Sequence, residues 1–140
     1  MKLGYQWGMV RLWVICAACI LAACGRPRWD RPDEAYKAFS AAVRKGELQA
    51  AYAGLSSPSR QAIEARAKEV ARASQGSVKD DPVLMLFASG YKPLPQGEVK
   101  VASENGPSAV VEVTVNGTAQ TQRMSKEGER WTVDLADAFK

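Results

Sequence analysis

Cysteine is the residue type in this chain with the greatest capacity for covalent chemistry. Its three copies are Cys16, Cys19 and Cys24, so all of them fall within the first 24 of the 140 residues. Histidine is absent. That absence excludes Ser-His-Asp and Cys-His catalysis, histidine-ligated zinc and histidine proton shuttles. Acid–base chemistry would therefore need another residue type.

The region around the cysteines has the organisation of a secretory signal peptide. Lys2 and Arg11 give it a basic start, and an unbroken apolar run of 12 residues follows from Leu12 to Ala23. Such a run extends only about 18 Å as a helix. A membrane-spanning helix needs about 20 residues. We therefore predict a signal peptide over residues 1–23 in preference to a permanent transmembrane helix.

The apolar run ends in the tetrapeptide Leu21-Ala22-Ala23-Cys24. This tetrapeptide resembles the lipobox of bacterial lipoproteins, Leu-(Ala/Ser)-(Gly/Ala)-Cys. Of the three cysteines, only Cys24 has an aliphatic residue three places upstream and alanine at both intervening positions. The resemblance implies that the Cys24 thiol receives a diacylglyceryl group and that a signal peptidase recognises Leu21, Ala22 and Ala23 and cuts before Cys24. An unmodified thiol in an ordinary signal peptide is the alternative.

The lipobox resemblance also implies a location. Two or three acyl chains such as palmitate would contribute about 20–30 kcal/mol of membrane binding, at about 0.8 kcal/mol per methylene. The protein would thus be lipid-anchored on the periplasmic side of a cell-envelope membrane. Gly25 is not the aspartate that commonly retains Gram-negative lipoproteins at the inner membrane. The outer membrane is therefore favoured if the cell is Gram-negative.

Removal of the signal peptide changes the meaning of the composition. Loss of Lys2 and Arg11 lowers the net charge from +4 to +2, and no cluster of basic residues interleaved with aromatic residues remains. We therefore predict no binding to nucleic acid. Residues 24–32 form the expected lipidated tether, in which Trp29 and three arginines either rest on the lipid headgroups or belong to a solvated spacer. Residues 33–140 form the expected single domain.

The first half of this domain has helical periodicity. Apolar residues recur at helical spacing, and Gly46, Gly54 and Gly90 follow candidate helix ends. The expected helices are 33–45, 47–53, 58–73, with a serine cap before Pro58, and 83–89. The last of these is apolar on every side, so we expect it to be buried throughout.

The second half alternates with the period of β-strands. The expected strands are 98–103, 109–115, 118–124 and 131–135. The turns between them are 104–107, 116–117 and 125–129, which makes the strands antiparallel. Val99 and Val101 are expected on one face of their strand, and Trp131 is expected on the inward face of the last strand. Strand 118–124 is polar and is expected to be an edge strand or an exposed strand. The predicted class is α+β, with N-terminal helices packed on a curved four-stranded antiparallel meander.

The chain from Asp33 onward is similar to small nuclear-transport-factor-2-like lipoproteins. Two parts of the chain carry the resemblance, an opening helix pair and a closing Trp-x-Val strand. The matching residues are Ala35, Phe39, Ala42, Gly46, Leu55, Ser56, Arg60, Trp131, Thr132 and Val133. The resemblance implies a cone-shaped fold. That fold usually has a strand between the second and third helices, and none is evident in 55–60, so a truncated cone is expected.

Enzymes with the cone fold commonly use an Asp-His pair or a carboxylate–Tyr pair inside the cone. The first is impossible here, and the second would have to come from Tyr36 or Tyr52 with Glu112 or Asp134. The expectation is that both tyrosines pack in the core and that both carboxylates are solvated. Neither a phosphate-binding glycine loop nor a metal-ligand cluster is present in the sequence, so we predict no catalytic residues, no metal and no cofactor.

Three hypotheses of function remain at this point. The first is a non-catalytic envelope lipoprotein that binds a small apolar ligand or a protein, with a possible pocket at Tyr36, Tyr52 and Trp131. The second is a cone-fold enzyme that uses a carboxylate–Tyr pair. The third is a structural envelope component that contacts assembly machinery by strand addition at 118–124.

Overall fold

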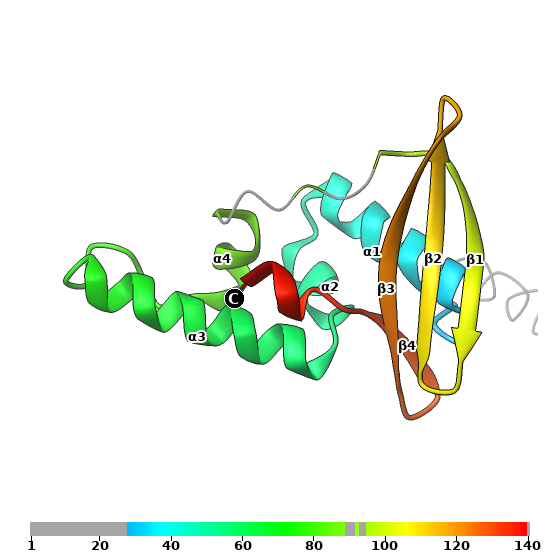
Figure 1. Ribbon diagram of the computed structural model, residues 1–140. Coiled ribbons are helices and arrows are strands. Elements are labelled where there is room, and N and C mark those ends of the chain that lie inside the picture. Colours follow the sequence, from blue (N-terminus) through cyan, green and yellow to red (C-terminus); the bar gives the residue numbers. More distant parts are fainter. Residues whose placement is uncertain (1–27, 89–91, 93–94, 140) are drawn as a thin grey trace, which may run out of the picture.

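The computed structural model describes residues 28–88, 92 and 95–139, so the predicted signal peptide and lipobox lie outside the described residues. Four helices precede four strands, and Figure 1 shows the sheet at one end of the molecule. The α+β class is confirmed. The elements are α1 (Pro32–Lys45), α2 (Leu48–Ala53), α3 (Ser57–Ala73), α4 (Pro82–Ala88), β1 (Glu98–Asn105), β2 (Ser108–Val115), β3 (Thr118–Glu127), β4 (Arg130–Val133) and the 3₁₀ helix η1 (Ala136–Phe139).

The helices begin and end at residues whose chemistry suits a helix terminus. Gly46 ends α1 in the left-handed conformation, with φ 71°, which costs glycine little because it has no Cβ. Ser56 caps α3 by accepting a 3.3 Å hydrogen bond from the Ser59 amide. The Asp81 carboxylate caps α4, accepting from the amides of Val83 and Leu84 at 3.0 and 3.1 Å.

The strands form one antiparallel sheet in the order β1-β2-β3-β4. The Asn116-Gly117 turn joins β2 to β3 as the sequence predicts, with positive φ at both residues. The predicted turn over 125–129 is wrong. Ser125 and Lys126 pair with Thr132 and Trp131, so β3 continues to Glu127 and the turn shrinks to Gly128-Glu129. The last residues of β3 are polar and resemble a turn in the sequence, but their pairing with β4 makes them a strand.

The polar segment 118–124 was expected to be an edge strand or an exposed one, and its residues are mostly exposed. It pairs with β2 along its whole length, and Met124 also pairs with β4. Only 118–123 has a side that no described strand covers. The other edge is β1, whose residues are exposed except for half-buried Val99. Val101, expected on the same face as Val99, is 37% exposed.

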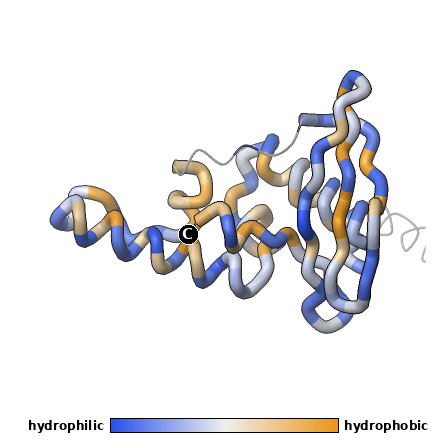
Figure 2. Tube along the Cα trace, in the orientation of Figure 1, coloured by the Kyte–Doolittle hydropathy of each residue, from blue (hydrophilic) through white to orange (hydrophobic). Residues whose placement is uncertain are grey.

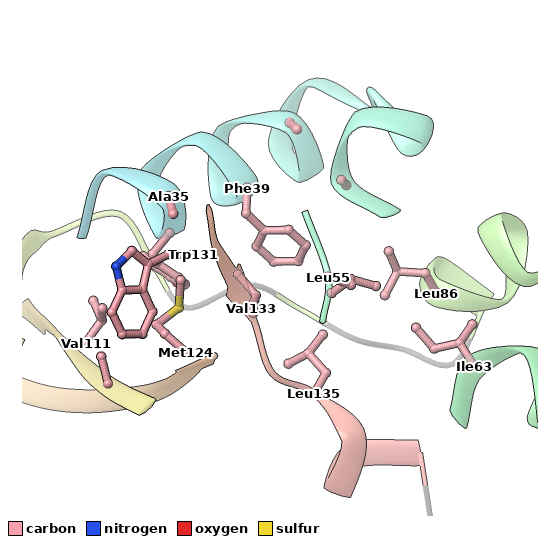
Figure 3. Close-up of a cluster of buried hydrophobic side chains, with 14 of the residues drawn as sticks. Ala35, Phe39, Leu55, Ile63, Leu86, Val111, Met124, Trp131, Val133 and Leu135 are labelled. Atoms are coloured by element: carbon pink, nitrogen blue, oxygen red, sulfur yellow. The ribbon is translucent and has the colours of Figure 1, made fainter. Parts of the chain in front are cut away.

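The core lies between α1 and the sheet and continues toward the other helices. Helix α1 contacts β1, β2 and β4, whereas α3 packs on α4 and η1 and projects away from the sheet (Figure 1). Figure 3 shows Trp131, Met124 and Val111 beneath α1, and Leu55, Leu86 and Ile63 extending the cluster toward α3 and α4. The expectation that the helices as a group cover the sheet therefore holds for α1, while the other helices form a second body beside it.

The outer edge of β4 is covered by two segments. One follows α2 (Gly54–Ser56), and the other, which contains Trp29, precedes α1. The Ser56 amide donates to the Val133 carbonyl, and the Val133 amide donates to the Gly54 carbonyl, both at 2.9 Å. These bonds make Leu55 and Val133 a one-residue parallel bridge. The sequence shows no strand over 55–60, and a single bridging residue is too short to produce an alternating pattern.

Trp29 completes this edge. Its carbonyl accepts a 2.7 Å hydrogen bond from the Trp131 amide, and its ring packs on Gly54. A Cβ on Gly54 would lie 3.2 Å from the Trp29 ring, so the missing side chain leaves room for the indole. Trp29 is therefore neither in a solvated spacer nor directed only at lipid headgroups. Trp29 packs against the domain, although the sequence predicts it to lie in the tether of residues 24–32.

Candidate binding surface

Of the three residues predicted to form one pocket, Tyr36 and Trp131 belong to the hydrophobic core and Tyr52 packs against it. Trp131 is 1% exposed and belongs to the core beneath α1, with Lys126 Nζ 5.8 Å from its ring centroid. Tyr36 is buried on α1 and borders a cavity at the start of β1. Tyr52 is half-buried on α2 and faces α3. A shared pocket of Tyr36, Tyr52 and Trp131 is not what the described residues form.

The cavity beside Tyr36 has a volume of about 400 Å³, which is within the range of small-molecule sites. Its polar rim includes Lys37 and Arg44, and no acidic residue is among its described lining residues. Lys37, however, donates a 2.8 Å hydrogen bond to Glu34, and this bond is the main reason that the pKa of Glu34 is lowered. The Lys37 charge is thus largely neutralised, which weakens the cavity as a site for an anion.

A carboxylate–Tyr pair exists, but with a carboxylate that sequence reasoning missed. The Tyr52 hydroxyl donates a 3.0 Å hydrogen bond to Glu64 Oε1. Burial of the phenol, helped by the nearby Glu64 carboxylate, raises the pKa of Tyr52 to about 12. Glu64 is exposed, and neither residue lines the cavities described here. The pair joins α2 to α3 at the surface, and a 12-residue separation on two helices gives no recognisable motif.

The two carboxylates singled out from the sequence have different environments. Glu112 lies on β2 opposite Lys100, on the strand face away from buried Val111 and Val113, as expected. Asp134, expected to be solvated, instead accepts hydrogen bonds from Ser59 Oγ at 3.4 Å and from the Ala136 amide at 3.0 Å. It therefore fixes the start of η1 against α3 and has a structural role.

An apolar surface with two of the exposed large hydrophobic side chains, Val78 and Leu84, surrounds α4. One hollow of about 560 Å³ lies between α2 and α4, and another of about 550 Å³ lies among α3, α4 and η1. Figure 2 shows α4 as a continuous hydrophobic segment. We call the apolar side chains of these two hollows the α4 surface. They are Leu48, Ala50, Val70, Val78, Val83, Leu84, Met85, Ala88, Ala138 and Phe139.

The α4 surface corrects one expectation from the sequence. The apolar helix was expected to be buried on all sides, and Met85 and Leu86 are indeed buried. Leu84, however, is 52% exposed, and Val78 in the preceding connector is 43% exposed. Helix α4 packs on α2 and α3 and has no described element over its remaining side. An apolar helix without a complete cover is the signal that identifies this surface.

Comparison with protein-family models, curated protein sequences and solved structures finds no significant match for this chain. Within residues 28–88, 92 and 95–139, no three side chains of the metal-ligating types come together. Among the same residues, no helix has the length and hydropathy needed to cross a bilayer.

Proposed function

We propose that this protein is a lipid-anchored lipoprotein of the bacterial cell envelope whose domain binds another protein without catalysing a reaction. The observation that carries the binding role is Leu84, which is 52% exposed on a helix of wholly apolar sequence. Large exposed apolar side chains that border apolar hollows are typical of protein interaction sites.

A protein partner fits the α4 surface better than a small apolar ligand does. The surface is split into two hollows on either side of α4, with Leu84 in one and Val78 in the other. A small ligand would occupy one hollow and leave the other apolar side chain in water. A protein surface can cover both hollows at once, with residues such as Glu47, Arg66 and Glu69 forming a polar rim.

The anchor is supported by the tetrapeptide Leu21-Ala22-Ala23-Cys24 and by the basic and apolar zones before it. The test is a Cys24→Ser variant, followed by membrane fractionation and by intact-mass analysis of the wild-type protein. We expect the wild type to carry the mass of its acyl chains and to sediment with membranes, and the variant to lose both. A wild-type mass without lipid would overturn the anchor.

The binding role is tested by placing a photoreactive amino acid at Leu84 in native membranes. Position 68 on α3, which is an exposed lysine, is the matched control. We expect one discrete adduct from position 84, none from position 68, and loss of the adduct when Val78 is also changed to Asp. Equal labelling at both positions would refute a specific site on the α4 surface.

A structural role by strand addition is the second candidate, because β3 has a partly uncovered edge. The two-residue turn pairs Val115 with Thr118, so the backbone groups of Ala119 and Thr121 point away from β2. A partner strand there would need the Thr121 amide. Proline at position 121 would remove that donor without breaking a β2 hydrogen bond. If this variant loses its envelope partner while Leu84 variants keep theirs, strand addition is the better account.

A further inference from the structure

Trp29 packs on Gly54 and bonds to β4, and this position restricts how the domain sits on a membrane. We infer that the end of the domain around Trp29 lies against the lipid surface and that the outer end of α3 points away from it. This inference rests on the proposed lipidation of Cys24. The interaction surface, called here the anchor-proximal face, consists of Arg28, Trp29, Arg31, Glu129 and Arg130.

The first step is the reach of the chain. Five residues separate Cys24 from Trp29 in numbering. Even a fully extended chain covers at most about 18 Å in five residues. Trp29 itself is held in place because its carbonyl accepts from the Trp131 amide and its ring packs on Gly54. Trp29 therefore belongs to the packed domain and not to the tether, which makes the tether shorter than the range 24–32 predicted from the sequence.

The second step compares this reach with the size of the domain. A domain of about 110 residues has a radius of gyration of about 13 Å, which corresponds to a body roughly 34 Å across. The reach of the tether is about half of that width. The domain cannot turn over without pulling Trp29 from its site, so the side that carries Trp29 stays near the membrane.

The third step is the chemistry of the anchor-proximal face. Tryptophan and arginine are the side chains that best suit the headgroup region of a bilayer. Trp29 is half-buried, the Arg31 side chain is 58% exposed, and the Arg130 guanidinium lies over the Trp29 ring at 4.0 Å. Asp30 and Glu129 lie in the same region, and Asp33 pairs with Arg31 at 3.1 Å. The net charge is therefore small, and the tether determines the orientation more than electrostatic attraction does.

The fourth step identifies the opposite end. Helix α3 has 17 residues and so extends about 26 Å. It runs away from the sheet, and the turn after it is far from β4 (Figure 1). Ser77 in that turn is exposed and belongs to the far end, whereas Glu129 in the β3–β4 turn belongs to the anchor-proximal face. The orientation leaves the outer end of α3 free in the aqueous compartment.

The test uses the full lipoprotein, purified from membranes and reconstituted in vesicles of phosphatidylethanolamine and phosphatidylglycerol. In the processed chain Cys24 is the only cysteine. A single Glu129→Cys or Ser77→Cys substitution therefore supplies the only free thiol for a donor dye once Cys24 is acylated. Energy transfer to acceptor-labelled headgroups is then compared between the two positions. We expect markedly higher transfer from position 129 than from position 77.

A linker variant provides the matched control. A flexible glycine-serine insertion of about 20 residues after Gly25 adds about 25 Å of average reach. We expect this insertion to reduce the difference between positions 129 and 77 to little or nothing. Equal transfer from both positions with the native tether would overturn the inferred orientation. Absence of acyl chains from the purified protein, seen by its mass, would instead refute the anchor, so the two failures are distinguishable.

Discussion

The guanidinium carbon of Arg130 lies 4.0 Å from the centroid of the Trp29 ring. This cation–π contact joins the start of the packed chain to the first residue of the last strand, about a hundred residues later. Arg130 also donates a 3.2 Å hydrogen bond to the Ala53 carbonyl, so it ties Trp29 and the end of α2 to the sheet. Trp29 and Arg130 are thus distant in sequence but in contact, and substitutions at this contact can test the fold.

Replacing Trp29 by Ala should lower the free energy of unfolding by about 2 kcal/mol. The change removes a cation–π contact of about 0.5–2 kcal/mol and uncovers Gly54 and the part of the core against which Trp29 packs. Urea denaturation of the chain from residue 25 onward measures it. Trp29→Phe, which keeps an aromatic ring, should lose less than half as much. An unchanged midpoint for the alanine variant would mean that Trp29 does not pack as described.

Glu127 and Glu129 allow a helix-capping glutamate to be compared with a nearby exposed one. Glu127 accepts hydrogen bonds from the Ser57 amide at 2.5 Å and from Ser57 Oγ at 3.1 Å, so a residue from β3 satisfies the start of α3. Glu127→Ala should therefore cost about 1–2 kcal/mol of stability. Glu129→Ala changes an exposed turn residue and should cost less than about 0.5 kcal/mol. Thermal unfolding of both variants gives the comparison, and equal losses would contradict the capping role.

Position 97 requires glycine because a side chain would not fit there. Position 46 favours glycine because its backbone is in the left-handed conformation. A Cβ on Gly97 would overlap the carbonyl oxygen of Thr114, a backbone atom that cannot move alone. Gly97→Ala should therefore displace the start of β1 and cost about 2–3 kcal/mol. Gly46→Ala meets no neighbour and should cost only the left-handed strain of about 1 kcal/mol. The reverse order in denaturant unfolding would be incompatible with the described path of residues 95–98.

Leu84 and Leu86 distinguish the α4 surface from the core within one helix. Leu86 is 0% exposed, and Leu86→Ala should cost about 2–5 kcal/mol. Leu84 is 52% exposed, so Leu84→Ala should change stability by no more than about 1 kcal/mol. Circular dichroism during urea unfolding separates the two. A large loss for Leu84→Ala would show that something in the free protein already covers it.

Because of Tyr52, the stability of the fold should depend on pH in the alkaline range. Its folded pKa of about 12 exceeds the usual value of 10, chiefly because the phenol is buried. The neutral phenol is thus favoured in the folded state, and the resulting stability is complete below pH 10 and is lost as the pH rises toward 12. Tyr52→Phe should flatten stability across that window. Glu64→Gln should lower the Tyr52 pKa only in part, as followed by phenolate absorbance. A phenol that titrates near 10 in the folded wild type would contradict the packing.

The extent to which the sequence predicts the structure depends on how local each signal is. Gly46, Ser56 and the Asn116-Gly117 turn act on their immediate neighbours, and the elements that they delimit form as expected. The extension of β3 was missed because its last residues become a strand only through pairing with β4. The bridge at Leu55 was missed for the same reason, since the partner Val133 is distant in sequence.

In the candidate sites, too, local features were predictable and contacts between residues distant in sequence were not. Burial of Tyr36 and Trp131 was predictable from helix and strand periodicity, but the neighbours of Tyr52 were not, because periodicity gives a face and not a position in space. The Tyr52–Glu64 pair depends on how α2 packs against α3. The exposure of Leu84 depends on which sides of α4 have neighbours, and composition alone suggests the opposite.

The position of β4 in the chain has a consequence for the order in which the molecule folds. Synthesis delivers the helices first, yet β4 supplies Trp131 and Val133 to the core and also binds Trp29 and the Leu55 region. Contacts between such distant residues form slowly, because a long loop must close first. A nascent chain that stops before Val133 lacks the contacts between α1 and β4 and has no partner for Leu55. Such an unfinished chain would depend on chaperones until its last strand is synthesised.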